Sequence, residues 1–121
     1  MSKVLIVDDS PTQLYQLRQI VERAGHQIVT AESGEQALEL ANFEHPNVIL
    51  MDIVMPGMSG YQAKRQLGRE ESTRHIPVIF VSSKDGEADR VWGLRQGAAE
   101  YVTKPVNPNL LLTAISEAMA A

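Results

Sequence analysis

The chain has 121 residues, of which 44% are hydrophobic and 21% are charged, as is typical of one globular domain with its own core. A formal net charge of −4 argues against nonspecific binding to nucleic acid, and no apolar stretch is long enough to cross a membrane. The chain contains no cysteine, which excludes disulfides, and no signal peptide follows Met1, so we expect a cytoplasmic protein.

The first half of the chain is predicted to alternate between strands and helices. The apolar run Val4–Val7 is typical of a strand that is buried on both faces of a parallel sheet. A helix follows, because Ser10 is a favourable N-cap, Pro11 suits the first turn and Gly25 terminates helices. Its apolar side is predicted to consist of Leu14, Leu17, Val21 and Ala24. The next predicted elements are a strand at 27–30, a helix opened by the capping box of Ser33 and Gln36, and a strand at 48–51.

The second half continues this alternation. Residues 52–60 contain a proline and two glycines, and we expect a loop there. The elements predicted after it are a helix at 61–67, a strand at 77–81, a helix marked by Ala88, Val91, Trp92 and Arg95, a strand at 100–103, and a helix from Pro108 to Met119. Alternating strands and helices predict an α/β domain with helices on both faces of a parallel sheet, spanning 1–121 without a separate effector domain.

Acidic residues follow two of the predicted strands, and a lysine follows a third. Asp8 and Asp9 come directly after the first strand, Asp52 after the third and Lys104 after the fifth. Because the carboxyl ends of parallel strands share one edge of the sheet, we expect these side chains to lie close together. Clustered carboxylates repel one another unless a hard cation such as Mg2+ binds them. The sequence therefore predicts a site that binds magnesium and a phosphoryl group.

Each of these residues has a chemical role in such a site. Of Asp8 and Asp9, one is expected to bind the metal directly and the other through water. Asp52 is the candidate nucleophile, Lys104 offers a positive charge to a phosphoryl oxygen, and the hydroxyl of Ser82 is a hydrogen-bond donor. Taken singly, Asp9 is better explained as a turn residue and Lys104 as a solvated lysine. Their combination at neighbouring strand ends favours a functional site.

Four segments of the chain resemble the receiver domain of two-component response regulators. They are Val7–Ser10, Met51–Gly60, Val81–Ser83 and Tyr101–Pro105. The resemblance covers the whole chain and implies a flavodoxin-like, doubly wound fold with five parallel strands in the order 2-1-3-4-5. It also implies a cis peptide bond before Pro105.

The resemblance implies a phosphoryl-accepting function rather than an enzyme that acts on a separate substrate. Asp52 would be the phosphoacceptor, and Mg2+ would be bound by Asp8, Asp9, Asp52 and the backbone carbonyl of Val54. The phosphoryl donor would be a histidine kinase or a phosphotransfer domain. The protein would catalyse only its own phosphorylation and dephosphorylation.

The resemblance also implies a conformational switch. Ser82 would move toward the new phosphoryl oxygens, Tyr101 would rotate inward into the vacated space, and Lys104 would sense the phosphate. These changes would repack the surface of the fourth helix, fifth strand and fifth helix. That surface would act on a downstream protein or on a second copy of the chain, with no nucleic-acid or membrane partner.

Two positions in this family influence how fast the acyl phosphate hydrolyses. They lie two residues beyond the phosphoacceptor and two beyond the switch hydroxyl, and here they are Val54 and Lys84. Valine cannot orient an attacking water, and the lysine is placed to shield the phosphate or pair with it. We therefore expect a longer-lived phosphate than in the fast chemotaxis type of regulator.

Within the family, three segments are most similar to the single-domain regulators of type IV pilus and twitching motility. They are Asp8–Thr12, Met51–Gly57 and Val91–Ala98. A phytochrome-coupled or a chemotaxis-like regulator is the alternative within the family.

Other classes of α/β protein fit the sequence less well. A dinucleotide enzyme would need the motif G-x-G-x-x-G, which is absent, and in a flavodoxin the pair Asp8 and Asp9 would repel the cofactor phosphate. A haloacid-dehalogenase phosphatase would need D-x-D after the first strand. The serious alternative is a pseudo-receiver, which binds a partner protein without being phosphorylated.

Overall fold

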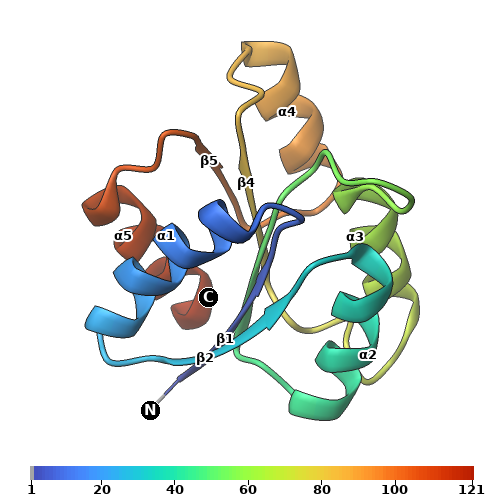
Figure 1. The fold of residues 1–121 in the computed structure, drawn as a ribbon. Coiled ribbons are helices and arrows are strands. Elements are labelled where there is room, and N and C mark those ends of the chain that lie inside the picture. Colours follow the sequence, from blue (N-terminus) through green and yellow to red (C-terminus); the bar gives the residue numbers. More distant parts are fainter. Residues whose placement is uncertain (1) are drawn as a thin grey trace.

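A computed structural model of the chain describes residues 2–121, in which five parallel strands form one sheet of order β2-β1-β3-β4-β5 (Figure 1). The strands are β1 (Lys3–Val7), β2 (Gln27–Ala31), β3 (Val48–Met51), β4 (Val78–Ser82) and β5 (Glu100–Thr103). The helices are α1 (Pro11–Arg23), α2 (Gly34–Glu44), α3 (Gly60–Arg69), α4 (Glu87–Arg95) and α5 (Pro108–Ala120). The predicted α/β class, the alternation of elements and the strand order are confirmed.

The sheet has a hydrophobic core on each face. α1 and α5 cover one face, and α2 and α3 cover the other, with α4 packed near β4 and β5 on that second side (Figure 1). In β1, Val4 and Ile6 pack on the side of α1 and α5, whereas Leu5 and Val7 pack on the opposite side. Successive side chains of a strand point to opposite faces, so every position is apolar where both faces are covered. This explains the uninterrupted apolar runs in the sequence.

The strand register brings the predicted site residues to one edge of the sheet. The backbone N–H of Asp52 donates to the carbonyl of Val7 at 2.9 Å, and that of Lys104 donates to the carbonyl of Ser82 at 2.9 Å. Backbone pairing therefore continues one residue beyond β3 and β5. Asp52 and Lys104 consequently leave the sheet at the same edge as the end of β1.

Side chains cap the helix starts largely as predicted, with one correction at α2. Ser10 accepts a hydrogen bond from the backbone N–H of Gln13 at 3.3 Å. Ser33 accepts one from the N–H of Gln36 at 3.1 Å, but the Gln36 side chain accepts from Glu32, at 2.8 Å, and not from Ser33. In α2 the Gln36 side chain therefore bonds to the backbone N–H one residue before the N-cap and not to that of the N-cap itself. Both amide groups near the helix start are still satisfied.

The C-terminal end of α1 corrects a second expectation. Ala24 is the C-cap residue and is exposed, although its spacing predicted a place on the apolar side of the helix. The helix ends at Arg23, and Gly25 has a φ of 94°, a left-handed conformation that suits glycine and turns the chain toward β2. No helix among residues 2–121 is long and apolar enough to span a membrane.

α4 forms where it is predicted but packs through a different residue. The residues whose spacing indicated this helix, Ala88, Val91, Trp92 and Arg95, are all exposed. Gly93 is the buried residue of α4. The ring of Trp92 instead packs edge-on against Tyr61 of α3, with ring centroids 6.5 Å apart.

Candidate functional site

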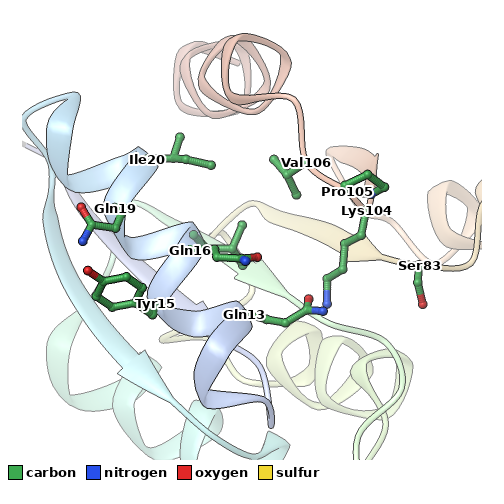
Figure 2. A pocket seen from close by; sticks show the side chains of 10 residues that line it. Gln13, Tyr15, Gln16, Gln19, Ile20, Ser83, Lys104, Pro105 and Val106 are labelled. Atoms are coloured by element: carbon green, nitrogen blue, oxygen red, sulfur yellow. The ribbon is translucent and has the colours of Figure 1, made fainter.

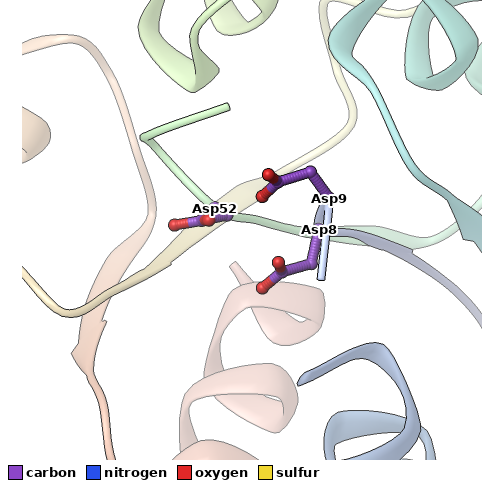
Figure 3. Close-up of side chains that lie close together, drawn as sticks. All are labelled: Asp8, Asp9 and Asp52. Carbon is purple, nitrogen blue, oxygen red and sulfur yellow. The ribbon is translucent and has the colours of Figure 1, made fainter. Parts of the chain in front are cut away.

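Three carboxylates meet at the carboxyl edge of the sheet (Figure 3). Asp8 and Asp9 directly follow β1, and Asp52 directly follows β3. One carboxylate oxygen from each residue lies within 4.8 Å of the others. Asp8 is fully buried and Asp52 is only 9% exposed, whereas Asp9 faces solvent. The arrangement concentrates negative charge at one point that water and small ions can reach from the side of Asp9.

Lys104 extends from the end of β5 into this acidic cluster. Its Nζ lies 2.8 Å from Oδ2 of Asp8 and 3.7 Å from Oδ1 of Asp52. The peptide bond between Lys104 and Pro105 is cis, as the sequence resemblance implies. The ammonium group thus compensates part of the charge of two buried carboxylates. Sequence reasoning placed the lysine near a phosphate but did not foresee its direct ion pair with Asp8.

Backbone amides orient the two buried carboxylates. Oδ1 of Asp8 accepts a hydrogen bond from the N–H of Ser10 at 2.9 Å, and Oδ1 of Asp52 accepts one from the N–H of Ile53 at 2.8 Å. In Asp52 the same oxygen, Oδ1, also makes the contact with Lys104. Oδ2 of Asp52 takes part in neither of these two contacts.

Burial raises the pKa of Asp52 above its ordinary value of 3.8. The nearby positive charge of Lys104 lowers this pKa, while the negative charge of Asp8 raises it further. The ionised form of Asp52 is therefore less favourable in this site than in water. A bound cation would favour the ionised form.

The loop after Asp52 is closed by a glycine that sequence reasoning did not single out. The N–H of Gly60 donates to the carbonyl of Ile53 at 2.8 Å. A Cβ atom at Gly60 would lie only 2.3 Å from the backbone oxygen of Asp52, so no other residue fits without moving the loop. Gly60 therefore allows α3 to start directly against the backbone of Asp52. The signal in the sequence was a glycine directly after the N-cap Ser59.

Ser82 and Tyr101 are both connected to the loop between β4 and α4. The hydroxyl of Ser82 is buried and accepts a hydrogen bond from the N–H of Lys84 at 3.1 Å. The hydroxyl of Tyr101 donates to the carbonyl of Lys84 at 2.7 Å. The Tyr101 ring is only 3% exposed, and burial raises the pKa of its hydroxyl. The ring thus lies inside the protein, and its predicted rotation on phosphorylation stays a prediction.

The two positions predicted to govern phosphate hydrolysis lie at the solvent side of the site. The side chains of Val54 and Lys84 are both exposed. Val54 follows Asp52 on the loop that leads to α3, and Lys84 lies on the loop between β4 and α4. The metal-binding role of the Val54 carbonyl stays a prediction.

A cavity of about 600 Å³ opens beside Lys104 (Figure 2). It lies between α1 and the segment that follows β5. Its lining includes the apolar side chains of Leu17, Ile20, Pro105 and Val106. Lys104 stands at the end of the cavity nearest the carboxylates and lines both regions. A molecule bound in this cavity would therefore be adjacent to the acidic cluster.

The donor set of the cluster fits a magnesium ion. Mg2+ prefers hard oxygen ligands, few of them from protein and the remainder from water or phosphate. Asp8, Asp9 and Asp52 supply three carboxylates close enough to share one ion, and the exposure of Asp9 leaves room for water. Softer metals favour sulfur or imidazole ligands, and neither is part of this group.

The fold and the acidic cluster define an α/β domain with a carboxylate site at one edge of its parallel sheet. Residues 4–116 match the response regulator receiver domain family, and the chain belongs to this family. The chain is 52% identical over 120 residues to the protein PilH of Pseudomonas aeruginosa, with 99% of each chain covered. It is 38% identical over 117 residues to the phosphate regulon regulator PhoB of Escherichia coli. That match covers 97% of this chain but 51% of PhoB.

Solved structures of receiver domains share the fold. A chemotaxis protein of Vibrio cholerae superimposes with a TM-score of 0.90 at 28% identity, covering 98% of each chain. The receiver domain of a sensor histidine kinase from Pseudomonas aeruginosa superimposes with a TM-score of 0.91 at 25% identity, covering 99% of this chain and 98% of that one. The latter structure has a magnesium ion coordinated in its active site cleft.

Proposed function

We propose that this protein is a stand-alone response regulator that accepts a phosphoryl group on Asp52 in a Mg2+-dependent reaction. The observation that carries the proposal is the meeting of Asp8, Asp9 and Asp52 within 4.8 Å, with Lys104 in contact with two of them. Similarity to PilH over 99% of each chain supports a regulator of the same type.

In the proposed reaction Asp52 is the nucleophile. Its carboxylate oxygen bonds to the phosphorus of a phosphohistidine while the phosphorus–nitrogen bond breaks and the electron pair stays on the imidazole. Mg2+, held by Asp8, Asp9, Asp52 and the carbonyl of Val54, would neutralise charge between the carboxylates and the phosphoryl oxygens. Lys104 exchanges its contact with Asp8 for a phosphoryl oxygen, which the flexible lysine stem permits.

The cavity beside Lys104 is the proposed approach for the phosphoryl donor. Its apolar lining on α1 and on the segment after β5 offers a surface that a helix of a histidine kinase or phosphotransfer domain can cover. A donor histidine held there would be adjacent to Lys104 and the carboxylates (Figure 2).

Phosphorylation would change the surface formed by α4, β5 and α5, and a partner protein would recognise this change. The phosphoryl group adds about −1.5 to −2 charges and new acceptor oxygens. The hydroxyl of Ser82 would turn from Lys84 toward these oxygens and release the loop that precedes α4. Leu110 of α5, which is exposed, and Arg90 of α4 line a groove on this surface. A downstream protein or a second copy of the chain would bind there.

Type IV pilus motility is the proposed pathway, with chemotaxis-like signalling as the related alternative. The support is the 52% identity to PilH, whose similarity extends over the whole length of both chains. A pull-down that compares beryllofluoride-treated with untreated protein tests this assignment. Capture of pilus or chemotaxis proteins only by the treated protein is the expected result, and capture of neither contradicts the assignment.

Phosphoryl uptake from acetyl phosphate tests the central proposal. We expect the wild type to gain one phosphoryl group in the presence of Mg2+ and none after the metal is chelated, as measured by intact-protein mass. Asp52→Asn should gain none, because an amide is not a nucleophile toward phosphorus. The control Asp85→Asn, at an exposed residue of the loop between β4 and α4, should behave as the wild type.

The same experiment separates the receiver from a pseudo-receiver. If neither acetyl phosphate nor a panel of phosphorylated histidine kinases labels the wild type, the protein is a phosphorylation-independent interaction module. Uptake by Asp52→Asn equal to that of the wild type would place the phosphoacceptor elsewhere.

The phosphorylated protein should decay slowly compared with fast chemotaxis regulators. Val54 exposes an apolar side chain that cannot orient water for attack on the acyl phosphate. Lys84, the second position that influences hydrolysis, carries an exposed positive charge. Introducing an amide by Val54→Asn should accelerate decay several-fold, while Val91→Asn on α4 should not. Phosphoprotein remaining over time gives the rate, and loss within seconds in the wild type would contradict the expectation.

A further inference from the structure

Gly93 is the residue through which α4 meets the sheet. It is the buried residue of this helix, and it faces the ring of Tyr101 on β5. A Cβ atom at position 93 would lie 2.6 Å from Cδ2 and 2.9 Å from Cε2 of that ring. Carbon atoms that are not bonded to one another pack at about 3.5–4.0 Å, so a methyl group and the ring cannot occupy these positions together.

Tyr101 is also constrained by its partner residue on β4 and by a hydrogen bond. The same added Cβ would be 3.4 Å from Cδ2 of Phe80, so both rings lie beneath Gly93. Phe80 is held in turn by an edge-to-face contact with Tyr61, with ring centroids 5.3 Å apart. The hydroxyl of Tyr101 is hydrogen-bonded to the carbonyl of Lys84. A larger residue at position 93 could therefore be accommodated only if the ring leaves or α4 lifts from the sheet.

We propose that the absence of a side chain at Gly93 leaves the space in which the Tyr101 ring lies inward, which makes Gly93 a positioning residue of the switch. The inference rests on the proposed function, because it names a residue that positions the aromatic side chain of the same switch. The buried ring and its hydrogen bond to the Lys84 carbonyl both depend on this space. Any side chain at position 93 would therefore disfavour the inward ring.

Replacing Gly93 by alanine tests the inference directly. We expect Tyr101 to become solvent-exposed in Gly93→Ala, measured in the metal-free protein as the shift of its fluorotyrosine NMR signal between light and heavy water. Gly68→Ala is the matched control, because it is also a helical glycine but has no heavy atom within 4 Å of an added Cβ. Tyr101 should stay shielded in the control. A Tyr101 signal as shielded in Gly93→Ala as in the wild type would overturn the proposal.

If Gly93→Ala folds poorly, a double-mutant cycle of urea unfolding with Tyr101→Ala tests the same inference. The substitution should lower the urea midpoint of the wild type but not that of the Tyr101→Ala variant, because the clash requires the ring. In the variant without the ring, alanine should even be tolerated better than glycine, since it favours helix. An equal loss of stability in both backgrounds would show that the clash with Tyr101 is not the cause and would overturn the proposal.

Beryllofluoride binding separates this inference from the proposed function. If the buried ring and the occupied site are coupled, Gly93→Ala should weaken Mg2+-dependent beryllofluoride binding about tenfold, as expected when the competent state falls to a tenth of its population. Gly68→Ala should bind as the wild type does. An exposed ring with unchanged beryllofluoride affinity would support the positioning role of Gly93 and contradict the coupling of Asp52 to the switch.

Discussion

Replacing Lys104 by methionine is expected to destabilise the metal-free protein by about 3 kcal/mol, because it removes one partner of a buried ion pair. The side chains of Lys104 and Asp8 are 12% and 2% exposed, and Nζ and Oδ2 are 2.8 Å apart. Methionine has a similar length but no charge, so the carboxylates of Asp8 and Asp52 would remain buried without this compensating cation. Urea unfolding with a chelator present measures the loss.

Magnesium should restore most of that stability. An ion bound by the three carboxylates would replace the lost positive charge, so millimolar Mg2+ should raise the midpoint of Lys104→Met more than that of the wild type. The same stability without and with magnesium would contradict a metal site at Asp8, Asp9 and Asp52.

Lys3→Met is the control, because it removes an ion pair of similar length that is much more exposed to solvent. Its Nζ is 2.9 Å from Oε1 of Glu44, nearly the same separation, but the two side chains are 31% and 28% exposed. A pair this exposed contributes about 0–1 kcal/mol, so the control should lose much less stability than Lys104→Met and should not respond to magnesium. Equal losses in both variants would show that burial does not decide the strength of these pairs.

Asp52→Asn is expected to stabilise the metal-free protein at neutral pH, because the folded protein disfavours the ionised carboxylate at this position. Burial raises the pKa of Asp52, so the folded protein prefers the neutral carboxyl group. Asparagine is neutral and of nearly the same shape. The lost attraction to Lys104, at 3.7 Å, offsets part of the gain.

The sign of the pH dependence follows from the direction of that shift. Below the unfolded-state pKa, near 3.8, Asp52 is protonated in both states and its contribution to stability is fully present. As the pH rises from there through the raised folded-state pKa, the unfolded chain releases its proton first and the wild type loses stability. The advantage of Asp52→Asn should therefore grow across this range and then level off.

Unfolding measured from acid to neutral pH, with a chelator present, checks this prediction. The difference between Asp52→Asn and the wild type is the relevant quantity, because other titrating groups are shared. Asp85→Asn, the same substitution at an exposed residue, provides the control for the change of residue type. An advantage of Asp52→Asn that shrinks as the pH rises would contradict the raised pKa.

The local sequence predicted most of the fold because its signals act over short distances. The apolar run Val48–Met51 has the bounds of β3, and the strand at 100–103 has the bounds of β5. Boundaries failed where tertiary contacts decide them. β2 continues through Ala31 because it pairs with Val7 of β1, and α3 extends to Arg69, two residues beyond the predicted end.

The candidate site was predictable for a related reason. Asp8, Asp52 and Lys104 each follow a strand directly, and parallel strands necessarily end at one edge of a sheet. Gly60 was not singled out, since its role depends on how closely the start of α3 approaches the backbone of Asp52. Such an approach is a property of packing and leaves no periodic pattern in the sequence.

The alternation of elements, the two-sided core and the acids at one edge can be predicted from local patterns, because strand and helix periodicities are local properties of the chain. The pairing of Lys104 with Asp8, 96 positions away, and the position of Tyr101 beneath Gly93 are evident only in the folded domain. These contacts depend on side-chain rotamers and on the distance between packed elements. Those quantities are set by long-range packing of the whole domain and not by the residues adjacent in the sequence.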